Sequence, residues 1–192
     1  MLKKILIIVI LIFVSISLWQ AFSIAAVKNK PKLESLNIIQ KSRITKQLGV
    51  LCKERNEFCE LKITYKSVKT PWYARLWYII NNEGGIYKGR IVASNDNSRW
   101  AYIQLTDVLL EDDAGVLMTL YHELSHFKQS KPQDYNGGYD ECMNHNYIKR
   151  QTRSFGNSIK EKYTASKDSK GIQYFIDHEG NQEISCNALI KQ

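Results

Sequence analysis

The chain has 192 residues, of which 44% are hydrophobic and 24% are charged, and its formal net charge is +8. This length suits one compact domain and is short for two, while the apolar content and the 3 prolines exclude a disordered adaptor. The basic excess would suit an anionic partner, but no nucleic-acid-binding motif accompanies it, so we do not expect a nucleic acid as partner.

The N-terminal segment, residues 1–27, is predicted to be a signal peptide or a membrane anchor. Lys3 and Lys4 precede an almost uncharged run from Ile5 to Val27. A basic start followed by an apolar stretch and small residues is typical of a secretory signal, and the run is also long enough to cross a bilayer as one helix. Both interpretations place residues 28–192, a single domain, outside the cytoplasm, with a possible membrane contact through the N-terminal segment.

The first half of the domain is expected to contain one helix followed by a small antiparallel sheet. Apolar residues recur with a helical period between Leu33 and Cys52. Because the turns between the later segments are short, neighbouring strands are expected to pair as hairpins. Alternating apolar and polar residues predict strands at Glu60–Val68, Leu76–Ile80, Ile86–Ser94 and Trp100–Leu105.

The second half is expected to be mainly helical. Acidic residues from Glu111 to Asp113 suit a helix N-terminus, where carboxylates cap free N–H groups and oppose the helix dipole. An apolar stripe then continues towards Gln129, where the first helix is predicted to end. A second helix is predicted from Tyr139 or Asp140 to about Arg153, and a strand-like run at 172–176.

The first of these helices carries the motif His122-Glu123-Leu124-Ser125-His126. Residues four apart point the same way from a helix, so His122 and His126 can bind one zinc ion. Glu123 would lie beside the metal and suits the role of general base towards a water molecule, which is the arrangement of H-E-x-x-H metallopeptidases. The motif therefore predicts one Zn²⁺ ion on His122 and His126, with Glu123 as the catalytic residue.

A catalytic zinc ion normally takes a third protein ligand, and the candidates lie on the second helix. That helix follows a Gly-Gly turn, so its N-terminal part can return towards the first helix. Glu141 and His145 are four residues apart and share one face, and Asp140 precedes Glu141. The residues themselves leave these three side chains as alternative ligands.

The stretch from Met118 to His126, followed by Glu141-Cys-Met-Asn-His145, resembles the gluzincin metallopeptidases. The resemblance extends roughly from Trp100 to Arg153 and rests mainly on the first motif. It implies an α+β, zincin-like fold, in which a small antiparallel sheet packs on the H-E-x-x-H helix and a second helix carries a ligand. It also implies that Glu141 is the third ligand and that His145 occupies the position of an acid that orients a ligand.

The four cysteines fit an exported protein, because disulfides form in oxidising compartments. Cys52 and Cys59 are close in sequence and could clamp the end of a helix, which leaves Cys142 with Cys186. The second pair would tie the C-terminal segment to the predicted metal site.

Together these features predict an exported or membrane-anchored zinc metallopeptidase whose partner is a peptide or protein substrate. Trp100–Leu105 would be the edge strand along which an extended substrate aligns. Two alternatives are a non-catalytic zinc-binding envelope protein that holds a partner through its basic face, and a zinc hydrolase that acts on another bond. The intact Glu123 favours catalysis, since a structural zinc site needs no general base.

Overall fold

The computed structural model divides the chain into two compact units, Met1–Lys32 and Leu33–Gln192. It describes residues 15, 33–70, 89–129, 131–134, 139–163, 176 and 186. The predicted signal peptide or anchor, the predicted strand at 76–80 and most of the strand-like run at 172–176 lie outside the described residues. Among the helices that are described, none is both long and apolar enough to cross a membrane.

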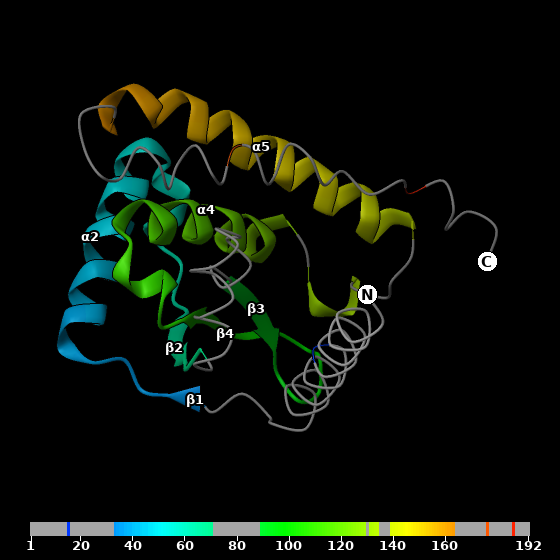
Figure 1. Cartoon of the computed structure of the whole chain (residues 1–192). Helices are drawn as coiled ribbons and strands as arrows, with labels where there is room; N and C mark the ends of the chain where they lie inside the picture. The colour runs from blue at the N-terminus through cyan, green and yellow to red at the C-terminus, as the bar shows by residue number, and fades with distance from the viewer. Residues whose placement is uncertain are drawn as a thin grey trace, which may run out of the picture. The chain divides into compact units, whose positions relative to one another are not determined.

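Every labelled element belongs to the second unit (Figure 1). Three α-helices and a small sheet make up its described part, so the predicted α+β class is confirmed. The strands are β1 (Leu33–Glu34), β2 (Thr64–Val68), β3 (Gly89–Ala93) and β4 (Trp100–Thr106). The α-helices are α2 (Ile38–Glu54), α4 (Asp113–Gln129) and α5 (Tyr139–Tyr163), and the short 3-10 helices are η1 (Asn56–Phe58), η3 (Leu109–Glu111) and η4 (Pro132–Asp134).

The sheet has the strand order β1-β2-β4-β3 and is mixed. β3 and β4 form the predicted hairpin, in which Ile91 lies opposite Ile103, and Asn97 in their turn has a φ of 54°, which asparagine tolerates. β2, however, pairs with β4 in parallel. The prediction of a purely antiparallel sheet is therefore wrong, because a short turn determines only how β3 meets β4, and β2 and β4 are not neighbours in the sequence.

The strand order also corrects the predicted substrate edge. Trp100–Leu105 belongs to β4, which lies between β2 and β3 and has both of its edges paired. β3 and β1 are the two end strands of the sheet, so the outer edge of β3 pairs with no other described strand.

Helix α4 lies at the centre of the unit, packed on α2, α5 and β3 (Figure 1). Its N-terminus begins as predicted, with the Asp112 carboxylate accepting a hydrogen bond from Ala114 N at 3.0 Å. All residues from Ala114 to His126 are buried, so even the polar side chains of this helix are enclosed. The motif from His122 to His126 thus belongs to a helix that is enclosed by its neighbours.

Helix α5 continues to Tyr163, beyond the predicted end near Arg153. The reason is that its buried apolar face continues through Ile148, Phe155 and Ile159. The Phe155 ring stacks on Tyr121 of α4, with centroids 4.2 Å apart. These contacts hold α5 against α4 beyond the first turns of α5, which carry the candidate ligands.

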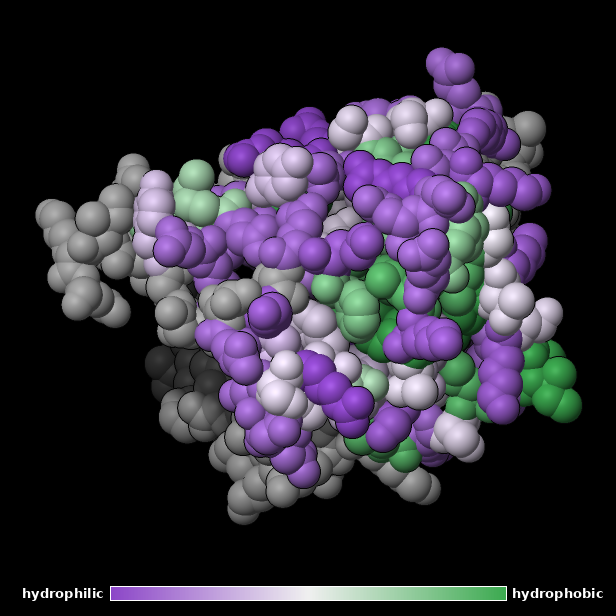
Figure 2. Space-filling view, turned by 180° about the vertical axis from the view of Figure 1, so that it is seen from behind, coloured by the Kyte–Doolittle hydropathy of each residue, from purple (hydrophilic) through white to green (hydrophobic). Residues whose placement is uncertain are grey.

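The surface is largely hydrophilic in the view of Figure 2, with apolar atoms protruding at one end. Ile38 and Ile39, at the start of α2, are 85% and 71% exposed. Further along the same helix, Ile44 and Leu51 are buried in the core. Only the later turns of α2 therefore bury their apolar side chains.

The Cys142–Cys186 disulfide is present, as predicted, with the two Cα atoms 5.7 Å apart. The other predicted pair is wrong in this structure, because Cys52 and Cys59 are free thiols. The two thiols lie next to each other. A hydrogen bond with Cys59, together with burial, raises the pKa of Cys52 to about 11.

Replacing Cys142 and Cys186 together with Ala should lower the free energy of unfolding by about 4 kcal/mol, because the bridge closes a loop of 44 residues in the unfolded chain. Urea unfolding of this variant and of the oxidised wild-type chain measures the difference. A matched Cys52→Ala, Cys59→Ala variant should show no comparable loss, and equal losses in both variants would contradict the disulfide's role.

Candidate metal centre

Three histidines from two helices meet at one point in the described structure. His122 and His126 come from α4 and are buried, and His145 comes from α5 and is half-buried. Their ligand atoms all lie within 4.8 Å of one another, and the Nε2 atoms of His122 and His126 are 3.1 Å apart. Two imidazole nitrogens on one tetrahedral zinc ion at about 2.0–2.1 Å lie about 3.3 Å apart. The spacing therefore fits a single metal ion.

The environment of these histidines keeps them neutral near pH 7. Burial lowers the pKa of His126 to about 3, and burial, followed by the neighbouring His126 and His145, holds the pKa of His122 well below its usual value. Burial, and then the charge of Lys149, also lowers the pKa of His145. Neutral imidazole is the form that ligates a metal ion, so the cluster is prepared for coordination.

His122 is oriented by a threonine of the neighbouring helix. Its Nδ1 lies 3.3 Å from Thr152 Oγ1, and that hydroxyl donates to the Ile148 carbonyl oxygen at 2.9 Å. Because the hydroxyl hydrogen is used, Thr152 accepts a hydrogen bond from Nδ1–H, which leaves the lone pair of His122 Nε2 directed at the cluster. The resemblance placed this orienting role at His145, whose ring instead lies among the candidate ligands.

Thr152 was missed by the sequence reasoning, although its spacing could have indicated it. It lies seven residues after His145 on α5, which is two helical turns, so both side chains share one face. Lys149 of α5 is a further buried charged residue beside the cluster. It is 7% exposed, and its charge acts on both His122 and His145.

Glu123 is held by the outer edge of β3. Its Oε2 accepts a hydrogen bond from Ile91 N at 2.8 Å, and the Glu123 side chain is buried. This backbone donor lies beside the cluster, on the edge of β3 that pairs with no other described strand. The carboxylate and the histidines therefore face the same space, as the predicted role of Glu123 requires.

That space is a cavity of about 430 Å³ lined by residues of β3, β4, α4 and α5. His122, Glu123, His126 and His145 all line it. Glu141 lines it too, whereas Asp140 is exposed and does not. The three histidines can hold a metal ion without Glu141. The ligand role of Glu141 therefore stays a prediction.

No family model, curated protein or solved structure matches this chain. What the site itself defines is a centre of three histidines that could hold a metal ion, beside a buried carboxylate.

The metal-free protein should lose stability as the pH falls from about 6.5 towards 3. The pKa of His126 is 6.5 in its unperturbed state and about 3 in the fold, so below pH 6.5 the unfolded chain binds more protons than the folded chain. His122 and His145 act in the same direction. Urea unfolding at a series of pH values in the presence of a chelator measures this slope, and a stability that is constant over this window would contradict it.

Proposed function

We propose that the protein is an exported or membrane-anchored zinc metallopeptidase with a zincin-like domain. The observation that carries the proposal is the single cavity that His122, His126, His145 and the buried Glu123 all line. Three nitrogen ligands that come from two helices leave room for water or substrate on a tetrahedral ion, which is the composition of a catalytic zinc site.

In the proposed reaction, His122 and His126 would hold the zinc ion together with His145, or with Glu141 in its place. Bound zinc would acidify a water molecule and polarise the substrate carbonyl. Glu123 accepts the proton as the water oxygen attacks the carbonyl carbon, and returns it to the leaving nitrogen when the C–N bond breaks. Thr152 keeps His122 in the tautomer that ligates through Nε2.

The substrate would bind along β3. An extended peptide can add to a free sheet edge through main-chain hydrogen bonds, and the outer edge of β3 borders the cavity at Gly89, Ile91 and Ala93. Because the Ile91 N–H is bonded to Glu123, a peptide that pairs with this position would compete for the donor.

Metal analysis of the purified chain, paired with casein cleavage, tests the proposal. We expect about one zinc ion per chain, cleavage that a chelator abolishes, and recovery when zinc is added back. A chain without metal would refute the proposal. Bound zinc without cleavage of casein or of a mixed peptide library would instead support a non-catalytic zinc-binding protein.

The third ligand can be identified from two alanine variants. His145→Ala should weaken zinc binding by more than about 100-fold, since loss of an outer hydrogen-bond partner alone costs up to that factor. Glu141→Ala should keep most of the affinity, because the three histidines form a complete set without it. Competition with a chromophoric chelator measures both affinities, with Asp140→Ala as the control outside the cavity. The opposite order would make Glu141 the ligand.

A further inference from the structure

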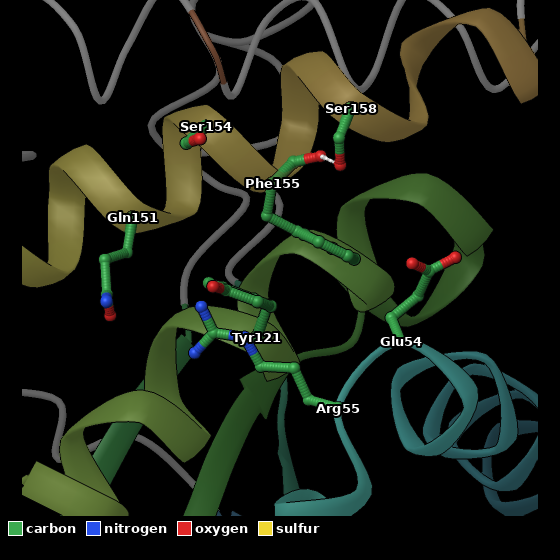
Figure 3. A pocket seen from close by; sticks show the side chains of 7 residues that line it. All are labelled: Glu54, Arg55, Tyr121, Gln151, Ser154, Phe155 and Ser158. Atoms are coloured by element: carbon green, nitrogen blue, oxygen red, sulfur yellow. Dashed lines mark hydrogen bonds between the residues drawn. The ribbon is translucent and has the colours of Figure 1, made fainter.

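A second pocket lies on another side of the α4–α5 pair. It has a volume of about 350 Å³ and opens between the C-terminal end of α2 and helices α4 and α5 (Figure 3). It shares no lining residue with the metal cavity. Its walls are Glu54, Arg55, Tyr121, Gln151, Ser154, Phe155 and Ser158.

The main charged group in this pocket is the guanidinium of Arg55, which two aromatic rings hold in place. Its Cζ atom lies 4.9 Å from the Tyr121 ring centroid and 5.9 Å from that of Phe58. Figure 3 shows the guanidinium against Tyr121, whose ring also stacks with Phe155 of α5. The Arg55 side chain is 35% exposed, so a ligand can reach it.

Most of the N–H donors of Arg55 are open. Within the described part of the chain, its one side-chain hydrogen bond joins Nη1 to Glu57 Oε1 over 3.4 Å, which is long for a charged pair. A guanidinium has five N–H donors in a planar fork that matches the two oxygens of a carboxylate or phosphate. Apart from this single long contact with Glu57, the donor fork of Arg55 is therefore open to a ligand.

The other polar walls also favour an acceptor ligand. The carboxylate of Glu54 is neutralised by Lys162 Nζ at 2.5 Å. The Gln151 side chain binds Gln129 and Tyr147, at 3.0 and 2.8 Å, which uses its amide oxygen. The hydroxyl of Ser154 has no partner among the described residues. The groups that remain open are thus mainly donors.

We propose that this pocket binds a small ligand through a carboxylate or phosphate group, with Arg55 as the bidentate donor and Ser154 as a second donor. The volume lies within the usual range of small-molecule sites, about 300–1,000 Å³, so the ligand is larger than the anion that anchors it. The proposal does not depend on the metal site, because the two cavities have separate linings.

The test is a titration of the metal-free full chain in detergent with acetate and, separately, with inorganic phosphate, at constant ionic strength. The Arg55 side-chain N–H resonance and the melting temperature report binding. We expect saturable binding of at least one anion; saturation by acetate alone identifies a carboxylate site, and saturation by phosphate alone identifies a phosphate site.

Matched variants make the result specific. Arg55→Gln should abolish saturation, and Arg55→Lys, which keeps the charge but loses the fork, should weaken binding about tenfold. Ser154→Ala removes one exposed hydroxyl, should leave the fold intact and should weaken binding several-fold. Arg99→Gln, an exposed arginine outside both cavities, should bind like the wild-type chain. The absence of saturation with both anions, or saturation unchanged in Arg55→Lys and Ser154→Ala, would overturn the proposal.

Discussion

Replacing Glu123 with Gln is expected to lower peptide hydrolysis by roughly 10²–10⁴-fold, the usual contribution of a general base, while the bound zinc remains. The glutamine amide oxygen can still accept the hydrogen bond that Ile91 N donates to Glu123, so the side chain should keep its position. It cannot take a proton from water at neutral pH. Single-turnover cleavage of a fluorogenic peptide and metal analysis of the same sample measure the two quantities.

The matched control is Glu111→Gln, which makes the same chemical change at an exposed residue of η3. It should leave both the rate and the zinc content unchanged. Full activity in Glu123→Gln would contradict the proposed mechanism. Loss of zinc together with activity would mean that Glu123 helps to bind the metal and would leave its role as a base unsupported.

Replacing Gly89 with Ala is expected to destabilise the domain by about 1–3 kcal/mol or more, the usual cost of overpacking a core. A Cβ atom at this position would lie 2.0 Å from the Thr119 Cγ2 atom and 3.3 Å from Glu123 Oε1. β3 would therefore have to move away from α4, which would also lengthen the bond between Ile91 and Glu123. Urea unfolding and the hydrolysis rate should both report this displacement.

A second substitution tests the reason for that loss. Thr119→Ser removes the methyl group that the new Cβ would strike and keeps the hydroxyl, so it should restore much of the stability of Gly89→Ala. By itself it should cost about 1 kcal/mol, the value of one buried methyl group. Losses that simply add in the double variant would contradict the predicted clash, because residues in contact should couple.

Gly49→Ala provides the matched control for a glycine substitution. Gly49 lies inside α2, and a Cβ atom added there would meet nothing within 4 Å. The change should stabilise the domain by about 0.5–1 kcal/mol, since alanine favours a helix over glycine. A similar loss in Gly49→Ala and Gly89→Ala would show that the effect of Gly89→Ala is not specific to the β3–α4 contact.

The local parts of the site could be predicted from the sequence. The i, i+4 spacing of His122 and His126 brings their ring nitrogens together on any α-helix, and the acidic start of α4 predicted where that helix begins. The same spacing placed Glu141 and His145 on one face of α5, and both line the metal cavity. These features depend on helix geometry, and helix geometry is determined by residues that lie within a few turns of each other.

The sequence by itself therefore determined a helix with two neighbouring histidines and a glutamate between them, an α+β class and the Cys142–Cys186 disulfide. The tertiary structure decided which strand borders the site, which residue orients His122, and that His145 joins the cluster. Each of these depends on how α4 meets β3 and α5. Such contacts join residues far apart in the chain, and they follow from how the whole core packs, which no short motif records.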